Sequence, residues 1–234
     1  MVPNLWPFLF ALIGNSTHKV KSFEIIFKLL KHDVFPLSLG GDHTLTLPIL
    51  RAMAKKYGPI ALLHIDAHAD INSHMFGEEI AHGTPFRRAF EEGLLDANRV
   101  FQIGLRGTGY TAEDFDWARD RGFHIVQAEQ LWHQSASPLM EQVTETIGTR
   151  PVYLSFDIDS LDPAYAPGTG TPEIGGLTTI QALEIIRGCR GLSLVGADLV
   201  EVSPPYDQQG NTALLAANLL FEMLCVLPGV TYRE

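Results

Sequence analysis

The chain has 234 residues, of which 46% are hydrophobic and 19% are charged, a composition typical of a soluble globular protein with one α/β domain. Its formal net charge of −10 argues against nucleic acid and against an anionic membrane surface as partners, because both demand basic residues. The apolar run Leu5–Ile13 is too short to span a bilayer, and no basic residue precedes it, so it makes a poor signal peptide.

Segments with helical and strand-like periodicity alternate along almost the whole chain. Apolar residues at helical spacing predict a helix over 23–30, followed by a strand at Val34–Leu39 and a helix over about 45–56. Further strands are expected at Ile60–Ile65, Val100–Leu105, His124–Val126, Val152–Phe156 and Ser193–Ala197. Further helices are expected at Ala112–Asp120, Leu139–Ile147, Thr179–Arg187 and Thr212–Leu224. This order predicts a parallel sheet covered by helices on both faces, a three-layer α/β/α sandwich.

The two cysteines, Cys189 and Cys225, each lie in or beside an apolar stretch. Neither has CxxC spacing or a histidine nearby in the sequence. We therefore expect two buried free thiols in a reducing compartment, rather than a disulfide or a nucleophile.

Acidic and histidine residues follow four of the predicted strands. The segments are Gly40–His43, His64–Asp70, Asp157–Asp159 and Glu201–Pro204. In a parallel sheet the carboxyl ends of the strands meet at one rim, where ligands bind. Because side chains at i and i+2 of an extended chain lie on the same side, Asp66, His68 and Asp70 can converge, and so can Asp157 and Asp159.

Packed carboxylates repel one another and shift toward protonation unless cations neutralise them. Four aspartates and two histidines suit two divalent ions with bridging carboxylates, and oxygen-rich ligation favours Mn²⁺ over Zn²⁺. Each segment alone is more often structural; Asp42, for example, is suited to cap the helix that follows. Their joint appearance at four strand ends is what indicates a metal site.

These segments resemble the signatures of the ureohydrolases, the family of arginase, agmatinase, guanidinobutyrase and guanidinopropionase. The matching runs are Gly-Gly-Asp-His at 40–43, Asp-Ala-His-Ala-Asp at 66–70, Ser-Phe-Asp-Ile-Asp-Ser-Leu-Asp-Pro at 155–163 and Glu-Val-Ser-Pro at 201–204. The stretch Ala164–Glu173 is similar to the agmatinase and guanidino-acid branch. The resemblance begins at about Ser22 and continues to the C-terminus.

The resemblance implies an arginase-like fold and a hydrolase with two Mn²⁺ per chain that cleaves a linear guanidino compound to urea and an amine. It gives one manganese to His43, Asp66, Asp70 and Asp157, and the other to Asp66, His68, Asp157 and Asp159. It also matches His82 to the family's proton-shuttling histidine and Glu201 to the glutamate that holds the guanidinium. A zinc deacetylase of similar architecture is a rival interpretation, which the Asp-x-His-x-Asp run disfavours.

Selectivity among guanidino compounds is expected to arise in the loop between Asp70 and His82, because the resemblance implies that all members of the family bind the guanidinium in the same way. Asn72, Ser73 and His74 are three hydrogen-bond donors in a row, suited to a carboxylate tail, and Met75 is expected to line the pocket. Asn72 also matches the arginase asparagine that meets a carboxylate, and the loop resembles the guanidinobutyrase branch. We therefore expect 4-guanidinobutyrate or a similar guanidino acid as substrate, with agmatine as the alternative and Glu78 and Glu79 on the solvated face of the loop.

The front of the chain departs from the family, which normally has two further βα units before Gly40. We expect an atypical segment, 1–19, followed by the catalytic domain, 20–234, in which a six-stranded sheet lacks the first two family strands. The strand at Val34–Leu39, where Pro36 is tolerated, should then be an exposed edge that promotes aggregation. An inactive truncated subunit is a further alternative.

The resemblance also implies a homo-oligomer, if the shortened N-terminus permits one. It implies a soluble intracellular protein, either cytoplasmic or mitochondrial.

Overall fold

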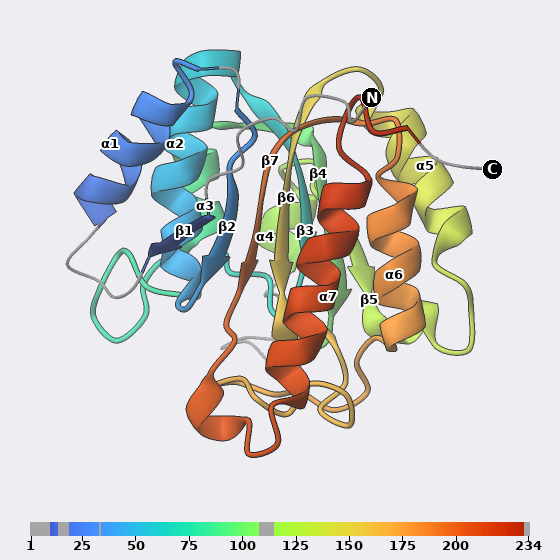
Figure 1. The fold of residues 1–234 in the computed structure, drawn as a ribbon. Coiled ribbons are helices and arrows are strands. Elements are labelled where there is room, and N and C mark those ends of the chain that lie inside the picture. The colour runs from blue at the N-terminus through green and yellow to red at the C-terminus, as the bar shows by residue number, and fades with distance from the viewer. Residues whose placement is uncertain (1–9, 14–18, 33, 108–114, 232–234) are drawn as a thin grey trace.

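A computed structural model of the chain describes residues 10–13, 19–32, 34–107 and 115–231 (Figure 1). Within these ranges seven strands form one sheet in the order β1-β2-β7-β6-β3-β4-β5, and every neighbouring pair is parallel. The strands are β1 (Phe10–Ile13), β2 (Leu37–Gly40), β3 (Ile60–Ile65), β4 (Leu95–Leu105), β5 (His124–Gln127), β6 (Pro151–Asp157) and β7 (Ser193–Val200). The helices are α1 (Lys19–Leu29), α2 (Thr46–Tyr57), α3 (Pro85–Glu91), α4 (Asp116–Arg119), α5 (Ser137–Ile147), α6 (Thr179–Gly188) and α7 (Asn211–Cys225).

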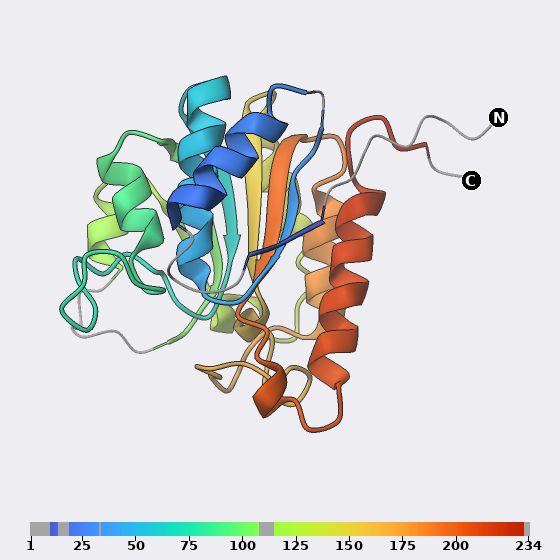
Figure 2. The same ribbon diagram turned by 60° about the vertical axis from the view of Figure 1, so that its left-hand side comes forward.

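Helices cover both faces of the sheet, as the side view in Figure 2 shows. Residues of α5, α6 and α7 pack on one face in a buried cluster that includes Leu154 and Ile185. Residues of α1 to α4 pack on the other face in a second cluster that includes Met53 and Phe86. The predicted three-layer α/β/α sandwich is therefore confirmed.

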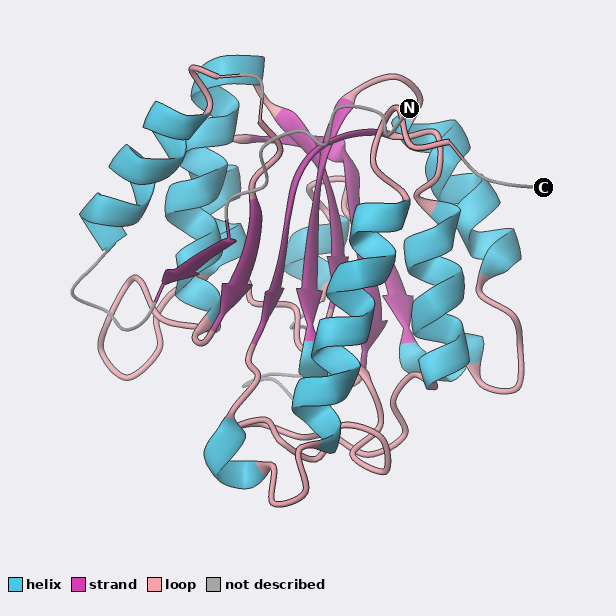
Figure 3. Ribbon diagram, in the orientation of Figure 1, coloured by secondary structure: helices cyan, strands magenta, loops and turns pink. Residues whose placement is uncertain are grey.

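The strands at the centre of the sheet are mostly apolar because helices cover both faces. All six residues of β3, Ile60–Ile65, are buried, and so are six of the seven residues of β6. The strands point toward one edge of the sheet, where long loops gather (Figure 3). This edge is where the acidic and histidine segments of the sequence lie.

The strand near residue 37 is not an edge strand, so the prediction of an exposed edge is wrong. On one side β2 pairs with β7, and on the other β1 pairs with it from Phe10↔Leu37 to Ile13↔Gly40. The physical reason is that the short apolar segment Phe10–Ile13 itself forms a strand, which satisfies the backbone groups expected to be open. The six strands expected are β2 to β7, and β1 is the seventh.

Element boundaries differ from the predictions in a few places. The strand expected at Val34–Leu39 begins only at Leu37, after Pro36, and β4 begins five residues earlier than expected. Of the helix expected at Ala112–Asp120, the structure has only Asp116–Arg119, and residues 112–114 lie outside the described residues. The first part of the apolar run, residues 5–9, also lies outside them.

The expectation of two buried thiols holds for one cysteine only. Cys189 is fully buried below the end of α6, whereas Cys225 is half-buried because it ends α7 near the surface. Neither forms a disulfide within the described residues, and burial raises the pKa of the Cys189 thiol to about 12. 

Among the residues that the structure describes, no helix is both long and apolar enough to cross a membrane.

Candidate active site

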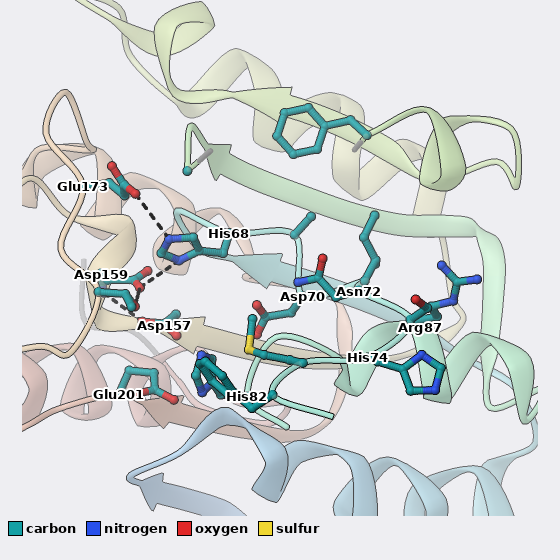
Figure 4. A pocket seen from close by; sticks show the side chains of 18 of the residues that line it. His68, Asp70, Asn72, His74, His82, Arg87, Asp157, Asp159, Glu173 and Glu201 are labelled. Atoms are coloured by element: carbon teal, nitrogen blue, oxygen red, sulfur yellow. Dashed lines mark hydrogen bonds and ion pairs between the residues drawn. The ribbon is translucent and has the colours of Figure 1, made fainter. Parts of the chain in front are cut away.

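The carboxyl edge of the sheet carries a cavity of about 640 Å³ (Figure 4). Five of the acid and histidine side chains that follow the strands line it: His68, Asp70, Asp157, Asp159 and Glu201. His43 and Asp66 lie at the same place but are fully buried. The structure thus brings together all six residues predicted as metal ligands, with Glu201 beside them.

The buried ring of His43 is the centre of one cluster of carboxylates. Its Nδ1 atom lies 3.0 Å from Asp70 Oδ2 and 3.3 Å from the Oδ2 atoms of both Asp66 and Asp157. This Nδ1 atom is buried and has no hydrogen-bond partner of acceptable geometry. The four residues are the first ligand set that the resemblance implies.

The hydrogen bond at the other ring nitrogen of His43, Nε2, bears on whether Nδ1 can bind a metal. Nε2 lies 2.9 Å from Ser155 Oγ, and this hydroxyl donates its hydrogen to Asp198 Oδ1 at 2.7 Å. The Ser155 oxygen must therefore accept from His43, which places a proton on Nε2 and leaves Nδ1 as the ring atom that can bind a cation. Three carboxylate oxygens around Nδ1 call for a cation: although burial lowers the pKa of His43, hydrogen bonds to Asp157, Asp66 and Asp70 raise it well above its usual value. A divalent metal ion can take the place of that proton, and one imidazole nitrogen with three carboxylate oxygens is a donor set that fits it.

A second cluster lies on the other side of Asp66. His68 Nδ1 is 3.5 Å from Asp66 Oδ1 and 3.1 Å from Asp159 Oδ2. The two oxygens of Asp66 thus face different histidines, Oδ2 toward His43 and Oδ1 toward His68. This is the arrangement expected of a carboxylate between two metal positions.

Ionisation of the clustered aspartates reflects their crowding. Burial, with the neighbouring charges of Asp159 and Asp66, raises the pKa of Asp157 well above its usual value. Burial and the Asp66 charge likewise raise the pKa of Asp159. Burial acts to raise the pKa of Asp66 too, but the surrounding histidines lower it well below the usual value. Divalent cations would let all of these groups remain ionised.

Two acidic residues of the site have a backbone conformation that is uncommon for residues other than glycine. The φ angles of Asp70 and Glu201 are 53° and 60°. The backbone N–H of Glu201 donates to Gly41 O at 2.9 Å, and its Oε1 accepts from the backbone N–H of His43 at 2.7 Å. Burial raises the pKa of the Glu201 carboxyl to about 7, so an adjacent cation would favour its charged form. Such strained conformations are typical of functional sites.

The loop that follows Asp70 forms one wall of the cavity. Asn72, His74 and Met75, the residues expected to meet the substrate, all line it, and so does the half-buried His82. The loop is closed by a backbone hydrogen bond from Asn72 N–H to Gly83 O at 3.0 Å. His74 is exposed, and its Nε2 lies 3.9 Å from the carboxylate of Glu79 at the rim.

The turn at the end of this loop is held by two backbone hydrogen bonds between Met75 and Glu78, of 3.0 and 2.9 Å. Glu78 and Glu79 are exposed and do not line the cavity, as expected for a solvated face.

A sequence model described as "Arginase family" matches residues 15–225. The chain belongs to the arginase family. It is 71% identical over 206 residues to a guanidinobutyrase of Pseudomonas aeruginosa, with 88% of this chain and 65% of that relative covered. It is 62% identical over 208 residues to a mitochondrial guanidino acid hydrolase of Homo sapiens, with 89% and 59% covered. The chain thus spans about three fifths of the length of the curated relatives that it matches.

Solved structures of this family share the fold. The proclavaminate amidino hydrolase of Streptomyces clavuligerus superposes with a TM-score of 0.83 and 40% identity, covering 94% of this chain and 73% of that one. The predicted family and the arginase-like fold are therefore confirmed. The match favours the ureohydrolases over the zinc deacetylases.

His64 and Gln102 are two residues of this arginase-family site that were not anticipated from the sequence. His64 Nε2 lies 2.7 Å from Asp66 Oδ2, and Gln102 Nε2 lies 2.8 Å from His64 Nδ1 and donates to Ala69 O at 2.6 Å. The Ala69 carbonyl fixes the orientation of the Gln102 amide, so His64 Nδ1 accepts and its Nε2–H donates to Asp66. With both nitrogens occupied, His64 positions Asp66 rather than binding a metal.

Arg106 is a third such residue. Its guanidinium donates to five backbone carbonyls of the neighbouring loops, at 2.6 to 3.3 Å: Asp159, Ser160, Leu161, Glu173 and Ile174. Arg106 therefore fixes the loop of Asp159 against the loop of Glu173. Glu173 in turn reaches the cavity and places Oε1 3.7 Å from His68 Nε2.

Proposed function

We propose that this chain hydrolyses a linear guanidino acid, 4-guanidinobutyrate or a similar compound, to urea and an amine. The observation that carries the proposal is the construction of a single cavity. Four of the six proposed metal ligands and Glu201 line one part of it, with His43 and Asp66 buried beside them, and hydrogen-bond donors line another part (Figure 4). The names of the relatives at 71% and 62% identity support it.

We assign the two metal positions to the two histidine clusters. One would be held by His43, Asp66, Asp70 and Asp157, and the other by Asp66, His68, Asp157 and Asp159. We propose Mn²⁺ for both because carboxylate oxygens outnumber imidazoles among the donors. When bound, these ions supply Lewis acidity, which makes water a competent nucleophile at neutral pH and neutralises the aspartates.

Glu201 is assigned to the guanidinium of the substrate. A carboxylate forms charge-assisted hydrogen bonds with the planar N–H edge of a guanidinium, and this would hold the carbon that is attacked beside the metal ligands. The hydrogen bond from the His43 backbone to Glu201 Oε1 fixes the carboxylate and leaves its second oxygen to the substrate.

His82 is assigned to proton transfer. The amine leaves well only when it is protonated, and a histidine titrates in the range needed for this step. His82 lies on the cavity wall at half-burial, with its ring centroid 6.0 Å from that of Phe76. It can therefore exchange its proton with solvent as well as with a bound amine.

Asn72, His74 and Met75 are assigned to the tail of the substrate. Asn72 and His74 offer N–H donors to a carboxylate, and Met75 offers apolar contact to the methylene chain. An agmatine tail, being a cation, would need an unpaired acid at this end instead. Agmatine is kept as the second candidate because a relative named agmatinase, from Gallus gallus, is 62% identical over 203 residues.

A urea-release assay over a panel of guanidino compounds tests the proposal. We expect 4-guanidinobutyrate to be turned over faster than agmatine, and Asn72→Ala to lower kcat/KM for the acid about tenfold to hundredfold through loss of a polar contact. Faster turnover of agmatine would sink the guanidino-acid assignment. Failure of metal-loaded, monodisperse protein to release any urea would favour the inactive-subunit alternative.

We further propose that the chain forms a homo-oligomer and acts inside the cell, in the cytoplasm or a mitochondrion. Relatives named as mitochondrial support the second compartment. Size-exclusion chromatography with light scattering tests the oligomer: a single species at the mass of one chain would contradict it.

A further inference from the structure

We infer that Arg87 is the charge partner of the substrate's carboxylate tail and so selects zwitterionic guanidino acids over dicationic guanidino amines. The inference rests on the proposed function for its choice of substrate, and it adds a specificity-determining residue outside the loop of Asn72. Arg87 belongs to α3 and lines the cavity. Its side chain is 24% exposed, so it is mostly shielded from water but open on one side.

The guanidinium of Arg87 is held in place from two directions. Its Nε donates to Glu91 Oε1 at 3.0 Å, one helical turn along α3. Its Cζ lies 4.7 Å from the centroid of the Trp117 ring, in a cation–π contact on the cavity wall. A planar group fixed at one edge and one face loses little conformational freedom when it binds a further partner.

The remaining edge of the Arg87 guanidinium has no partner among the residues that the structure describes. Among the described residues, none of its hydrogen bonds or ion pairs uses Nη1 or Nη2. Two parallel N–H donors at this edge match the two oxygens of a carboxylate. An ammonium group offers only N–H donors, so it cannot accept a hydrogen bond from this edge of the guanidinium.

The local charge supports the same occupant. Glu91 is the carboxylate that Arg87 contacts, but Glu91 Oε2 also pairs with Arg88 at 3.0 Å. One carboxylate between two guanidinium groups leaves a net positive charge on this part of α3. A cationic tail placed here would therefore be repelled, and an anionic tail would be attracted.

The two ends of the cavity have opposite characters. Figure 4 shows Arg87 and His74 at one end, with Asn72 between them and Asp70. It shows Glu173 and Glu201 toward the other, beside Asp159. A ligand with a cationic head and an anionic tail complements both ends at once. A guanidino acid is such a ligand, whereas agmatine complements only the acidic end.

The test compares Arg87→Gln and Arg87→Lys with Arg121→Gln as a matched control. Arg121 stacks on the same Trp117 ring, 4.3 Å from Cζ to the centroid, but does not line the cavity. Two readouts are taken on metal-loaded protein. One is kcat/KM for urea release from 4-guanidinobutyrate and from agmatine. The other is calorimetric binding of their amine products, 4-aminobutyrate and putrescine.

We expect Arg87→Gln to lower kcat/KM for 4-guanidinobutyrate about tenfold to hundredfold, chiefly through KM, and to leave agmatine unchanged or improved. Affinity for 4-aminobutyrate should fall by a similar factor while affinity for putrescine does not. Arg87→Lys keeps the charge without the fork and should fall between wild type and Arg87→Gln. Arg121→Gln should match wild type in both readouts.

The two proposals fail in different ways. If wild-type protein releases no urea but binds 4-aminobutyrate in an Arg87-dependent manner, the proposed function fails and the role of Arg87 stands. If Arg87→Gln and Arg87→Lys keep the wild-type preference between the two substrates and the wild-type affinity for 4-aminobutyrate, the role of Arg87 is overturned. A loss that is equal for acid and amine ligands also overturns it, because that would be a structural effect.

Discussion

Removal of the Ser155 hydroxyl would test how the His43 cluster is held ready for a metal. The hydroxyl is completely buried, accepts from His43 Nε2 at 2.9 Å and donates to Asp198 Oδ1 at 2.7 Å. In Ser155→Ala the ring proton of His43 loses its acceptor. Protonation of Nε2 is then no longer favoured, and a proton on Nδ1 would block the ring atom that faces the three aspartates.

The size of the effect follows from these contacts. A buried donor left without an acceptor costs about 1–3 kcal/mol, and this should appear in the free energy of unfolding. Asp198 is less affected because Thr46 and Tyr153 still donate to its Oδ2 at 2.7 and 2.8 Å. Partners that orient a metal-binding histidine are typically worth about tenfold to hundredfold in metal affinity. We expect Ser155→Ala to weaken manganese binding by this factor.

Manganese content per chain, measured by mass spectrometry across buffered free Mn²⁺ concentrations, gives the affinity without any need for activity. Thr46→Val is the matched control, because it removes a buried donor to the same Asp198 without touching His43. It should destabilise the fold but leave the manganese affinity near that of wild type. If Ser155→Ala loses stability and still binds manganese as tightly as wild type does, the reasoning about the His43 proton is refuted.

Three further predictions address the site and the core. Wild type should bind about two Mn²⁺ per chain by metal analysis, with Asp157→Ala losing more metal than Asp159→Ala because Asp157 is assigned to both positions; a single tight zinc would contradict this. His82→Asn should lower turnover about a hundredfold at unchanged metal content if His82 carries the proton, whereas full activity would make it a structural residue. Cys189 should resist iodoacetamide at pH 8 in folded protein and react once the protein is denatured, because burial holds its pKa at about 12 and keeps it as the unreactive thiol; rapid native alkylation detected by peptide mass spectrometry would show that the burial is wrong.

The convergence of the acids and histidines at the carboxyl ends of the strands was predictable because it follows from backbone periodicity. Asp66, His68 and Asp70 alternate after a buried strand, and parallel strands bring their carboxyl ends to one edge. The same rule is misleading at His64. Its spacing matches that of the proposed ligands, but its side chain donates a hydrogen bond to Asp66 and positions that carboxylate. Gln102, which lies opposite His64 on β4, donates to its Nδ1 and so directs its Nε2–H to Asp66; only the strand register reveals this neighbour.

The features that the sequence did not reveal depend on partners far away in the chain. The segment Phe10–Ile13 is too short to show a period, and its strand conformation depends on pairing with β2. Arg106 binds backbone carbonyls, which leave no signature in the sequence because every residue has one. Arg87 follows Phe86 on α3, and only the packing of that helix decides that Arg87 meets the cavity while Phe86 is buried.

The left-handed backbone at Asp70 and Glu201 bears on attempts to make the protein more robust. A side chain in this region costs on the order of 1 kcal/mol relative to glycine, so Asp70→Gly and Glu201→Gly would each relieve strain. At Glu201 this relief is opposed by loss of the hydrogen bond that its Oε1 accepts from the buried His43 N–H, a loss of about 1–3 kcal/mol. At Asp70 the described residues give the carboxylate no such backbone hydrogen bond, so a selection for thermal resistance alone would favour losing it, and with it part of the site. Any screen for thermostable variants should keep Asp70 and Glu201 unchanged and introduce stabilising substitutions in the helical layers instead.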